Sequence, residues 1–357
     1  MKKTIISVAP MIDKTDRHFR YFMRGITKEA LLYTEMVTAQ SIIRGNRNLI
    51  LDFNPIEKPL ALQLAASNVE ELVEAVQIAK DWDYDEINLN IGCPSDRVSG
   101  NHMGAVLMAY PYLVRDMIKA TKENTNKKVT VKHRIGIDGK GILDEIFERT
   151  LFDSYEDLKN FVDIIMEAKP DRLIIHARIA ILAGLSPKEN REIPPIRYEE
   201  VYKLKEEYPN IEIEINGGIK TEEQIDIHLE KVEGVMLGRE AYDNPYFMGI
   251  IDKYYGENPV SPTREEIALR MIPYIEEYEK KGGNPNSIIR HMLGLFHGVK
   301  GAKTWKNALS SVIIKELGGK EAERRRRIIG GSEDGENKEK IFKDRSSDPW
   351  NWIPDSW

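Results

Sequence analysis

The chain has 357 residues, of which 41% are hydrophobic and 31% charged, as expected for a soluble globular protein of one large domain or two ordinary ones. No apolar run approaches the ~20 residues of a membrane span, and the single cysteine, Cys93, excludes an internal disulfide framework and a cysteine-rich metal site. The net charge of −6 argues against a generally basic nucleic-acid coat but not against a local basic face, and we expect a cytoplasmic protein without membrane or metal.

Short β-rich runs alternate with helix-patterned segments over about the first 240 residues. This alternation predicts parallel strands joined by right-handed crossovers, and eight runs predict an α/β fold of the (β/α)8 TIM-barrel type. An open doubly wound sheet is the alternative, but it needs a glycine-rich loop after the first strand, and the segment from Pro10 to Asp13 contains no glycine. The runs are Thr4–Ala9, Leu32–Met36, Pro59–Leu64, Glu86–Ile91, Lys128–His133, Arg172–His176, Glu212–Ile215 and Gly234–Leu237.

Helical patterns continue after about residue 260 without strands between them, as in Thr263–Tyr278 and Ser287–Phe296. We therefore expect a C-terminal all-helical domain after the barrel. The predicted boundaries are a catalytic barrel at residues 1–258, a helical domain at 259–317 and a tail at 318–357. The tail is too poor in apolar residues to order itself.

In a TIM barrel the active site lies at the carboxyl ends of the strands, so polar residues there are candidates. The stretch NLNIGCPS at Asn88–Ser95 places Cys93 among polar neighbours at such an end. No histidine adjoins Cys93 in the sequence, so a nucleophilic Cys–His pair is not indicated locally. With an ordinary pKa of about 8.5, a thiol is protonated at neutral pH, which suits a proton donor.

Glycine-containing motifs follow the seventh and eighth runs, where TIM barrels build phosphate sites. A Gly-Gly pair lets backbone N–H groups approach phosphate oxygens, and an arginine adds a charge-assisted donor. Together they predict a bound phosphate ester. The motifs are Asn216-Gly217-Gly218 and Gly238-Arg239.

Gln63, Lys132 and His176 each end a different strand. An amide and a cation in these places suit the ring of a flat heteroaromatic cofactor that carries a 5′-phosphate, and a lysine near a flavin ring would stabilise negative charge there. The alternative is a set of unrelated surface ion pairs. The long polar loop after His176 adds Lys188 and Arg191, which either contact phosphates or belong to a solvated loop.

Taken together, these stretches resemble the tRNA-dihydrouridine synthases, over about residues 5 to 310. The resemblance also includes SVAPM at Ser7–Met11, TDR at Thr15–Arg17, YTEM at Tyr33–Met36 and KHRIG at Lys132–Gly136. The loop at Gly184–Pro195 and RHMLGL at Arg290–Leu295 resemble the A-type subgroup, which modifies D-loop positions 20 and 20a of tRNA.

That resemblance implies an FMN-binding barrel followed by a helical tRNA-binding domain, which we expect to be monomeric. NADPH would reduce FMN, the flavin N5 would deliver hydride to uracil C6, and Cys93 would protonate C5. The uridine must leave its stack to react, with Asn90 beside the base and Lys188 and Arg191 on the tRNA. The residues implied to hold FMN are Pro10, Met11, Gln63, Lys132, His176, Asn216, Gly217, Gly218, Gly238 and Arg239.

The C-terminal part of the chain is basic, with 13 Lys and Arg against 6 Asp and Glu from Arg270 to Gly331. Lys300, Lys303 and Lys306 are three residues apart and would share one face of a helix. Phosphate contacts dominate affinity for nucleic acids. We therefore expect Lys303 and Lys306 to bind tRNA, although an ordinary solvated helix face would look the same.

Two other functions are compatible with parts of this pattern. A flavin reductase of free pyrimidines, resembling dihydroorotate dehydrogenase, would share the barrel but would need no basic helical domain. A non-catalytic RNA-binding protein could keep the fold and the flavin for stability, but it would have no use for Cys93, Lys132 and Asn90 together.

Overall fold

The computed structural model of the chain describes residues 4–95, 102–256 and 261–310. The chain divides into two compact units, Met1–Met271 and Ile272–Trp357, and the division falls within helix α11 (Arg264–Lys280). The predicted tail at 318–357 lies outside the described residues.

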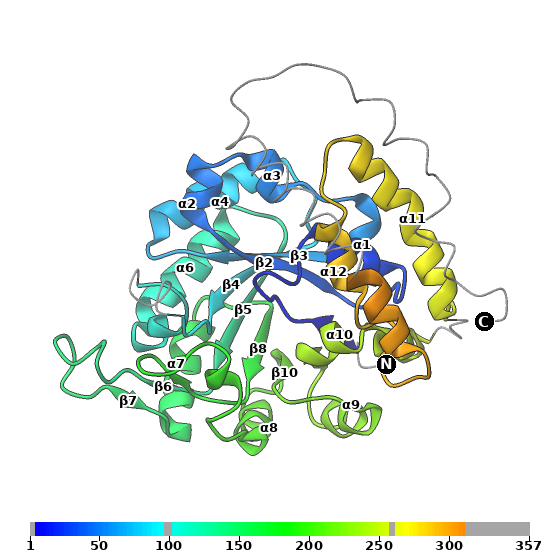
Figure 1. Cartoon of the computed structure of the whole chain (residues 1–357). Helices are drawn as coiled ribbons and strands as arrows, with labels where there is room; N and C mark the ends of the chain where they lie inside the picture. Colours follow the sequence, from blue (N-terminus) through cyan, green and yellow to red (C-terminus); the bar gives the residue numbers. More distant parts are fainter. Residues whose placement is uncertain (1–3, 96–101, 257–260, 311–357) are drawn as a thin grey trace, which may run out of the picture. The chain divides into compact units, whose positions relative to one another are not determined.

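The first unit is built on eight parallel strands in the order β1-β11-β10-β8-β5-β4-β3-β2. Figure 1 labels β2, β3, β4, β5, β8 and β10 of this sheet. The two ends of this order meet, because the N–H of Val8 donates to the carbonyl of Leu31, just before β2, at 3.0 Å. All eight predicted runs form these strands, which confirms the TIM-barrel prediction. The strands are β1 (Ile5–Val8), β2 (Leu32–Thr38), β3 (Leu60–Ala65), β4 (Glu86–Ile91), β5 (Lys128–Arg134), β8 (Arg172–His176), β10 (Glu212–Asn216) and β11 (Gly234–Leu237).

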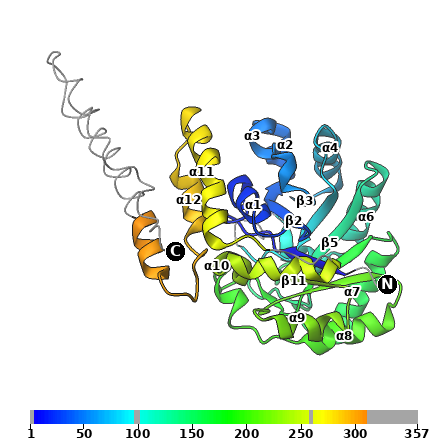
Figure 2. The ribbon, with the colours of Figure 1, turned by 90° about the vertical axis from the view of Figure 1, so that its right-hand side faces the viewer.

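Helices between the strands cover the outside of the barrel (Figures 1 and 2). Several begin at capping residues: Asn68 accepts from the N–H of Glu71, and Ser154 and Thr221 form capping boxes. The helices are α1 (Arg17–Arg24), α2 (Ala39–Arg44), α3 (Arg47–Leu51), α4 (Val69–Ala79), α6 (Pro111–Glu123), α7 (Tyr155–Met166), α8 (Tyr198–Glu207), α9 (Glu222–Leu229) and α10 (Arg239–Asp243), with 3₁₀ segments η1 (Pro55–Glu57), η2 (Gly104–Ala109), η3 (Glu189–Arg191) and η4 (Pro245–Tyr255).

A buried ion network crosses the interior of the barrel. Arg172, the first residue of β8, lies 2.7 Å from Glu86, the first residue of β4, and 3.0 Å from Glu214 on β10. The Tyr33 hydroxyl donates to Glu86 at 3.0 Å, and the Ser7 hydroxyl donates to Glu214. Because a buried charge without its partner costs about 3–5 kcal/mol, this network ties together strands that are not hydrogen-bonded neighbours in the sheet, such as β8 and β4.

A three-stranded sheet that the sequence patterns do not predict lies among the loops after the barrel strands. It has the order β7-β6-β9, with β6 (Ile137–Asp138), β7 (Leu151–Phe152) and β9 (Ala180–Ile181). Asn190, wholly buried, donates to the carbonyl of Ile181 at 2.9 Å and accepts from its N–H at 2.8 Å. The long loop after β8 is therefore held by this sheet.

The second unit is helical over its described residues. It contains the end of α11, α12 (Asn286–Met292) and a helical stretch at residues 302–310. The Trp305 indole N–H donates to the carbonyl of Met292 at 2.8 Å, and its ring packs on Phe296 at a centroid distance of 4.7 Å. In neither unit, over the described ranges, is a helix long and apolar enough to cross a membrane.

Candidate active site

Cys93 lies in the loop directly after β4, and two polar side chains hold this loop. The Asn90 side-chain oxygen accepts from the N–H of Gly92 at 3.2 Å and from that of Cys93 at 3.0 Å. From the neighbouring strand β5, the Arg134 guanidinium donates to the carbonyl of Gly92 at 3.0 Å. The cysteine is therefore presented in a fixed conformation at the carboxyl end of the barrel.

Burial raises the pKa of the Cys93 thiol above its ordinary value. The backbone N–H of Ser95 and the cations Arg134, Lys132 and Arg191 oppose this rise without cancelling it. The thiol is therefore protonated at neutral pH. It can give a proton to a bound molecule without an activating base.

Lys132 lies on β5 with its ammonium 3.4 Å from the side-chain oxygen of Asn216, whose amide donates to the carbonyl of Met236 at 2.8 Å. Burial, and then the neighbouring Arg134, lowers the pKa of Lys132 to about 8. Lys132 therefore stays a cation at neutral pH but is held in an environment that already has excess positive charge, which favours an anionic ligand.

His176 ends β8 and is 8% exposed. Burial and the cations Arg134, Lys132 and Arg178 lower the pKa of His176 well below its ordinary value, so the imidazole is neutral. Gly217 packs against this ring, because a Cβ at residue 217 would lie 2.8 Å from the His176 Cδ2.

The loop after β10 is shaped to admit an anion. Gly217 and Gly218 have φ angles of 125° and 73°, values that side chains rarely allow. Arg178, two residues after His176, is 9% exposed; its Nη1 donates to the carbonyl of Pro194, and its Nε has no hydrogen-bond partner among the described residues. Arg239 lies near enough to lower the pKa of Arg178. An orphaned buried donor with a second arginine near it, and a glycine loop packed against His176, fit a phosphate group.

The other predicted barrel residues lie at the same end of the strands. Pro10 and Met11 follow β1, and Gly238 precedes α10. Arg239 forms an ion pair with Glu192 at 2.7 Å. Gln63 is 0% exposed, and its side-chain amide is hydrogen-bonded to Asn88 and Asn90.

The predicted tRNA-binding lysines and arginine are exposed. Lys188 and Arg191 lie on the loop after β8, at η3. Lys303 and Lys306 lie in the second unit, on the helical stretch at residues 302–310, which confirms the helical expectation for their segment. The run of arginines at 324–327 is outside the described residues.

Arg134 and Arg178 belong to the site although the residues implied to hold FMN do not include them. Both are among the polar residues expected at strand ends, and Arg178 is one of the cations after His176 that could meet a phosphate. Strand periodicity supports both, since side chains two residues apart share a face. Lys132 and Arg134 on β5, and His176 with Arg178 just beyond β8, repeat with that spacing. In the described ranges no group of three His, Cys, Asp or Glu side chains is placed to hold a metal ion.

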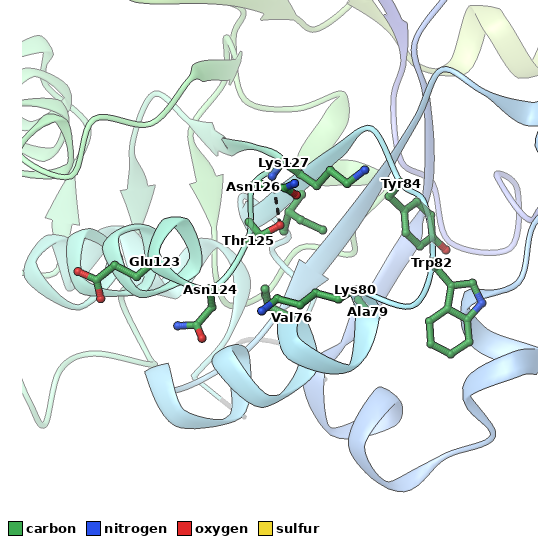
Figure 3. A pocket seen from close by; sticks show the side chains of 11 residues that line it. Val76, Ala79, Lys80, Trp82, Tyr84, Glu123, Asn124, Thr125, Asn126 and Lys127 are labelled. Atoms are coloured by element: carbon green, nitrogen blue, oxygen red, sulfur yellow. Dashed lines mark hydrogen bonds between the residues drawn. The ribbon is translucent and has the colours of Figure 1, made fainter.

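A cavity of about 500 Å³ lies at the other end of the barrel (Figure 3). It is lined by the end of α4, by Trp82 and Tyr84 in the connection from α4 to β4, and by the connection from α6 to β5, which includes Lys127. Tyr84 and Lys127 precede β4 and β5, whereas Cys93 follows β4. The cavity is therefore separate from the candidate site.

Comparisons with known proteins point to one family. The family model described as dihydrouridine synthase matches residues 7–327, beyond the limit of about residue 310 expected from the motifs. A tRNA-dihydrouridine(20/20a) synthase of a Synechocystis species is 51% identical over 317 residues, covering 88% of this chain and 91% of that protein. One from Shewanella oneidensis is 50% identical over 305 residues, covering 85% and 87%. The structure of an old yellow enzyme homologue from Zymomonas mobilis aligns with a TM-score of 0.49 at 10% identity, covering 74% and 91%.

Proposed function

The chain belongs to the dihydrouridine synthase family, and from this premise we propose that it reduces uridines 20 and 20a in the D-loop of tRNA to 5,6-dihydrouridine. We propose that FMN is its cofactor and NADPH the reductant. We also propose that the protein is a monomer and acts in the cytoplasm. The observation that carries the proposal is the Cys93 thiol, held protonated at a strand end beside Asn90 and a group of cations.

The barrel fits FMN through the orphaned Arg178 Nε and the glycine loop. Arg178, Arg239 and the backbone of Gly217 and Gly218 would hold the phosphate, and His176 would lie beside it. The residues proposed to hold the rest of the cofactor are Pro10, Met11, Gln63, Lys132, Asn216 and Gly238.

When bound, FMN supplies the hydride that uracil C6 receives. The protein's own part is to place and protonate the base. One Asn90 N–H donates to Gln63 and the other would meet the base, while the Cys93 thiol would be the proton donor to uracil C5. Lys188 and Arg191 on the loop after β8, and Lys303 and Lys306 in the second unit, would bind tRNA phosphates.

The first test is an absorbance spectrum of the purified protein, followed by anaerobic reoxidation of the NADPH-reduced flavin by tRNA that lacks dihydrouridine. We expect the purified protein to be yellow. We expect tRNA that lacks dihydrouridine to reoxidise its reduced flavin, and fully modified tRNA not to reoxidise it. The matched variant Cys93→Ala should keep its flavin spectrum and lose reoxidation by about 10²-fold or more, the usual share of a general acid.

Three other results would contradict parts of this proposal. A yellow protein whose reduced flavin is not reoxidised by tRNA would favour a reductase of free pyrimidines. A colourless protein that does not take up FMN would contradict the phosphate site. Reoxidation by Cys93→Ala at close to the wild-type rate would remove Cys93 from the role of proton donor.

A further inference from the structure

Asn90, the residue that holds the Cys93 loop, is itself held from below by hydrogen bonds. Its amide nitrogen donates to the side-chain oxygen of Gln63 at 2.8 Å. The Gln63 nitrogen in turn donates to the side-chain oxygen of Asn88 at 2.8 Å. Gln63 and Asn88 are wholly buried and pair in register on β3 and β4.

The same series continues down to the buried ion network. The Asn88 amide nitrogen donates to the Thr130 hydroxyl oxygen at 2.8 Å, and that hydroxyl donates to Glu86 at 2.5 Å. Glu86 also receives hydrogen bonds from Arg172 and Tyr33. We call the series Glu86, Thr130, Asn88, Gln63 and Asn90 the amide chain.

Both ends of the amide chain enforce one direction. The Glu86 carboxylate, paired with Arg172, can only accept, so Thr130 must donate to it and must accept from Asn88. At the other end, the backbone N–H groups of Gly92 and Cys93 can only donate, so Asn90 must turn its oxygen to them. The side-chain amides of Asn88, Gln63 and Asn90 are therefore each fixed in one of two orientations. Flipping one of them would place two donors, or two acceptors, against each other and break a hydrogen bond.

We propose that Glu86, acting through Thr130, Asn88 and Gln63, is a positioning group for the reaction at Cys93. Together with the backbone N–H groups of Gly92 and Cys93, it keeps the Asn90 side-chain oxygen turned toward the Cys93 loop. That oxygen already accepts two hydrogen bonds, so Asn90 offers the site only an N–H, which has no partner among the described residues. Asn90 therefore recognises an acceptor atom, such as a pyrimidine carbonyl oxygen. This deepens the proposed function and rests on it.

The test removes one link without changing its shape. Thr130→Val deletes the hydroxyl and leaves the buried Asn88 nitrogen without an acceptor, which weakens the preference for the native amide orientations. Thr130→Ser keeps the hydroxyl and should rescue. Thr121→Val is the matched control, because Thr121 is equally buried but its hydroxyl donates to the carbonyl of Met117 within α6.

Cys93 provides a readout that needs neither tRNA nor NADPH. It is the single cysteine of the sequence, so alkylation by iodoacetamide reports this loop alone. We expect Thr130→Val to speed alkylation about fivefold or more, because the loop loses its fixed partner, while Thr130→Ser and Thr121→Val stay at the wild-type rate. In single-turnover reoxidation by tRNA, Thr130→Val should lose rate by a similar factor with its flavin spectrum unchanged.

Equal alkylation rates in Thr130→Val and Thr121→Val would overturn the proposal. If Thr130→Val does not fold, Glu86→Gln replaces it, since this near-isosteric amide removes the acceptor-only end. A faster alkylation of Cys93 in Thr130→Val, found in a protein whose reduced flavin tRNA does not reoxidise, would support the amide chain and contradict the proposed function. The two failures are therefore distinguishable.

Discussion

The charge of Lys132 depends on pH within the range of ordinary assays. Burial and Arg134 lower the pKa of Lys132 to about 8, whereas a lysine in the unfolded chain titrates near 10.4. Below pH 8 the ammonium faces the proposed cofactor site as a cation. Above pH 8 the site loses that charge. The free energy of unfolding does not fall as a result: between pH 8 and 10.4 the unfolded chain binds more protons than the folded one, so the contribution of Lys132 to stability rises with pH there.

We therefore predict that the FMN-free protein binds FMN more weakly as pH rises from 7 to 9, by up to about tenfold per pH unit above 8. An anionic ligand favours the protonated lysine, which sets the sign. Titrations of flavin fluorescence at each pH measure this effect. Lys132→Met is the control: its affinity should be lower and nearly constant over the same range, and a wild-type profile that is equally flat would contradict the assignment.

At the scale of elements, the loop after β10 carries the most constrained residue of the proposed phosphate site. Gly217 has a φ of 125°, and a Cβ there would lie 2.8 Å from Cδ2 and 3.2 Å from Nε2 of His176. A side chain at 217 therefore has to displace either the loop or the imidazole, and both face the proposed cofactor phosphate.

We predict that Gly217→Ala weakens FMN binding by about tenfold or more, the equivalent of ~1.4 kcal/mol, while the protein stays folded. The control is Gly256→Ala, which also places a side chain at a positive φ, here 83°, but has no atom within 4 Å of the new Cβ. Equilibrium dialysis with FMN and thermal unfolding separate the two effects. Equal losses of affinity in both variants would show that the collision with His176 is irrelevant.

The barrel strands are predictable from the sequence because each is a short run rich in buried apolar residues, and several end in a polar residue, as β8 does at His176 and β10 at Asn216. The small sheet is not predictable, because β6 and β9 have two residues each and show no periodicity. The sequence also places Gln63 at a strand end without showing that Asn88 and Asn90 of the neighbouring strand enclose its amide. Cross-strand register decides that, and it is a property of the closed barrel.

At the scale of the whole molecule, basic residues concentrate in the C-terminal part of a chain whose net charge is −6. The second unit contains Trp305 and Leu309, which are buried at 4% and 1% exposure, whereas Lys303 and Lys306 on the same helical stretch are exposed. The apolar side of that stretch is thus used for packing, and the charged side is free to act on a ligand.

We predict that Lys303→Glu combined with Lys306→Glu weakens tRNA binding and makes it less dependent on salt. If each lysine contacts one phosphate, the slope of log affinity against log salt should fall by about 1.4–1.8. FMN content should stay at the wild-type level, because both lysines are in the second unit and the proposed cofactor residues are in the first.

The control for that variant is Lys80→Glu combined with Lys119→Glu, which makes the same change in net charge at exposed positions at the end of α4 and on α6. General repulsion of an acidic protein from tRNA would affect both double variants alike. If Lys303 and Lys306 contact tRNA, the slope of log affinity against log salt should change in their double variant and stay unchanged in the Lys80 and Lys119 control. Filter binding across a salt series distinguishes the two, and equal slopes would leave the second unit's lysines outside the tRNA interface.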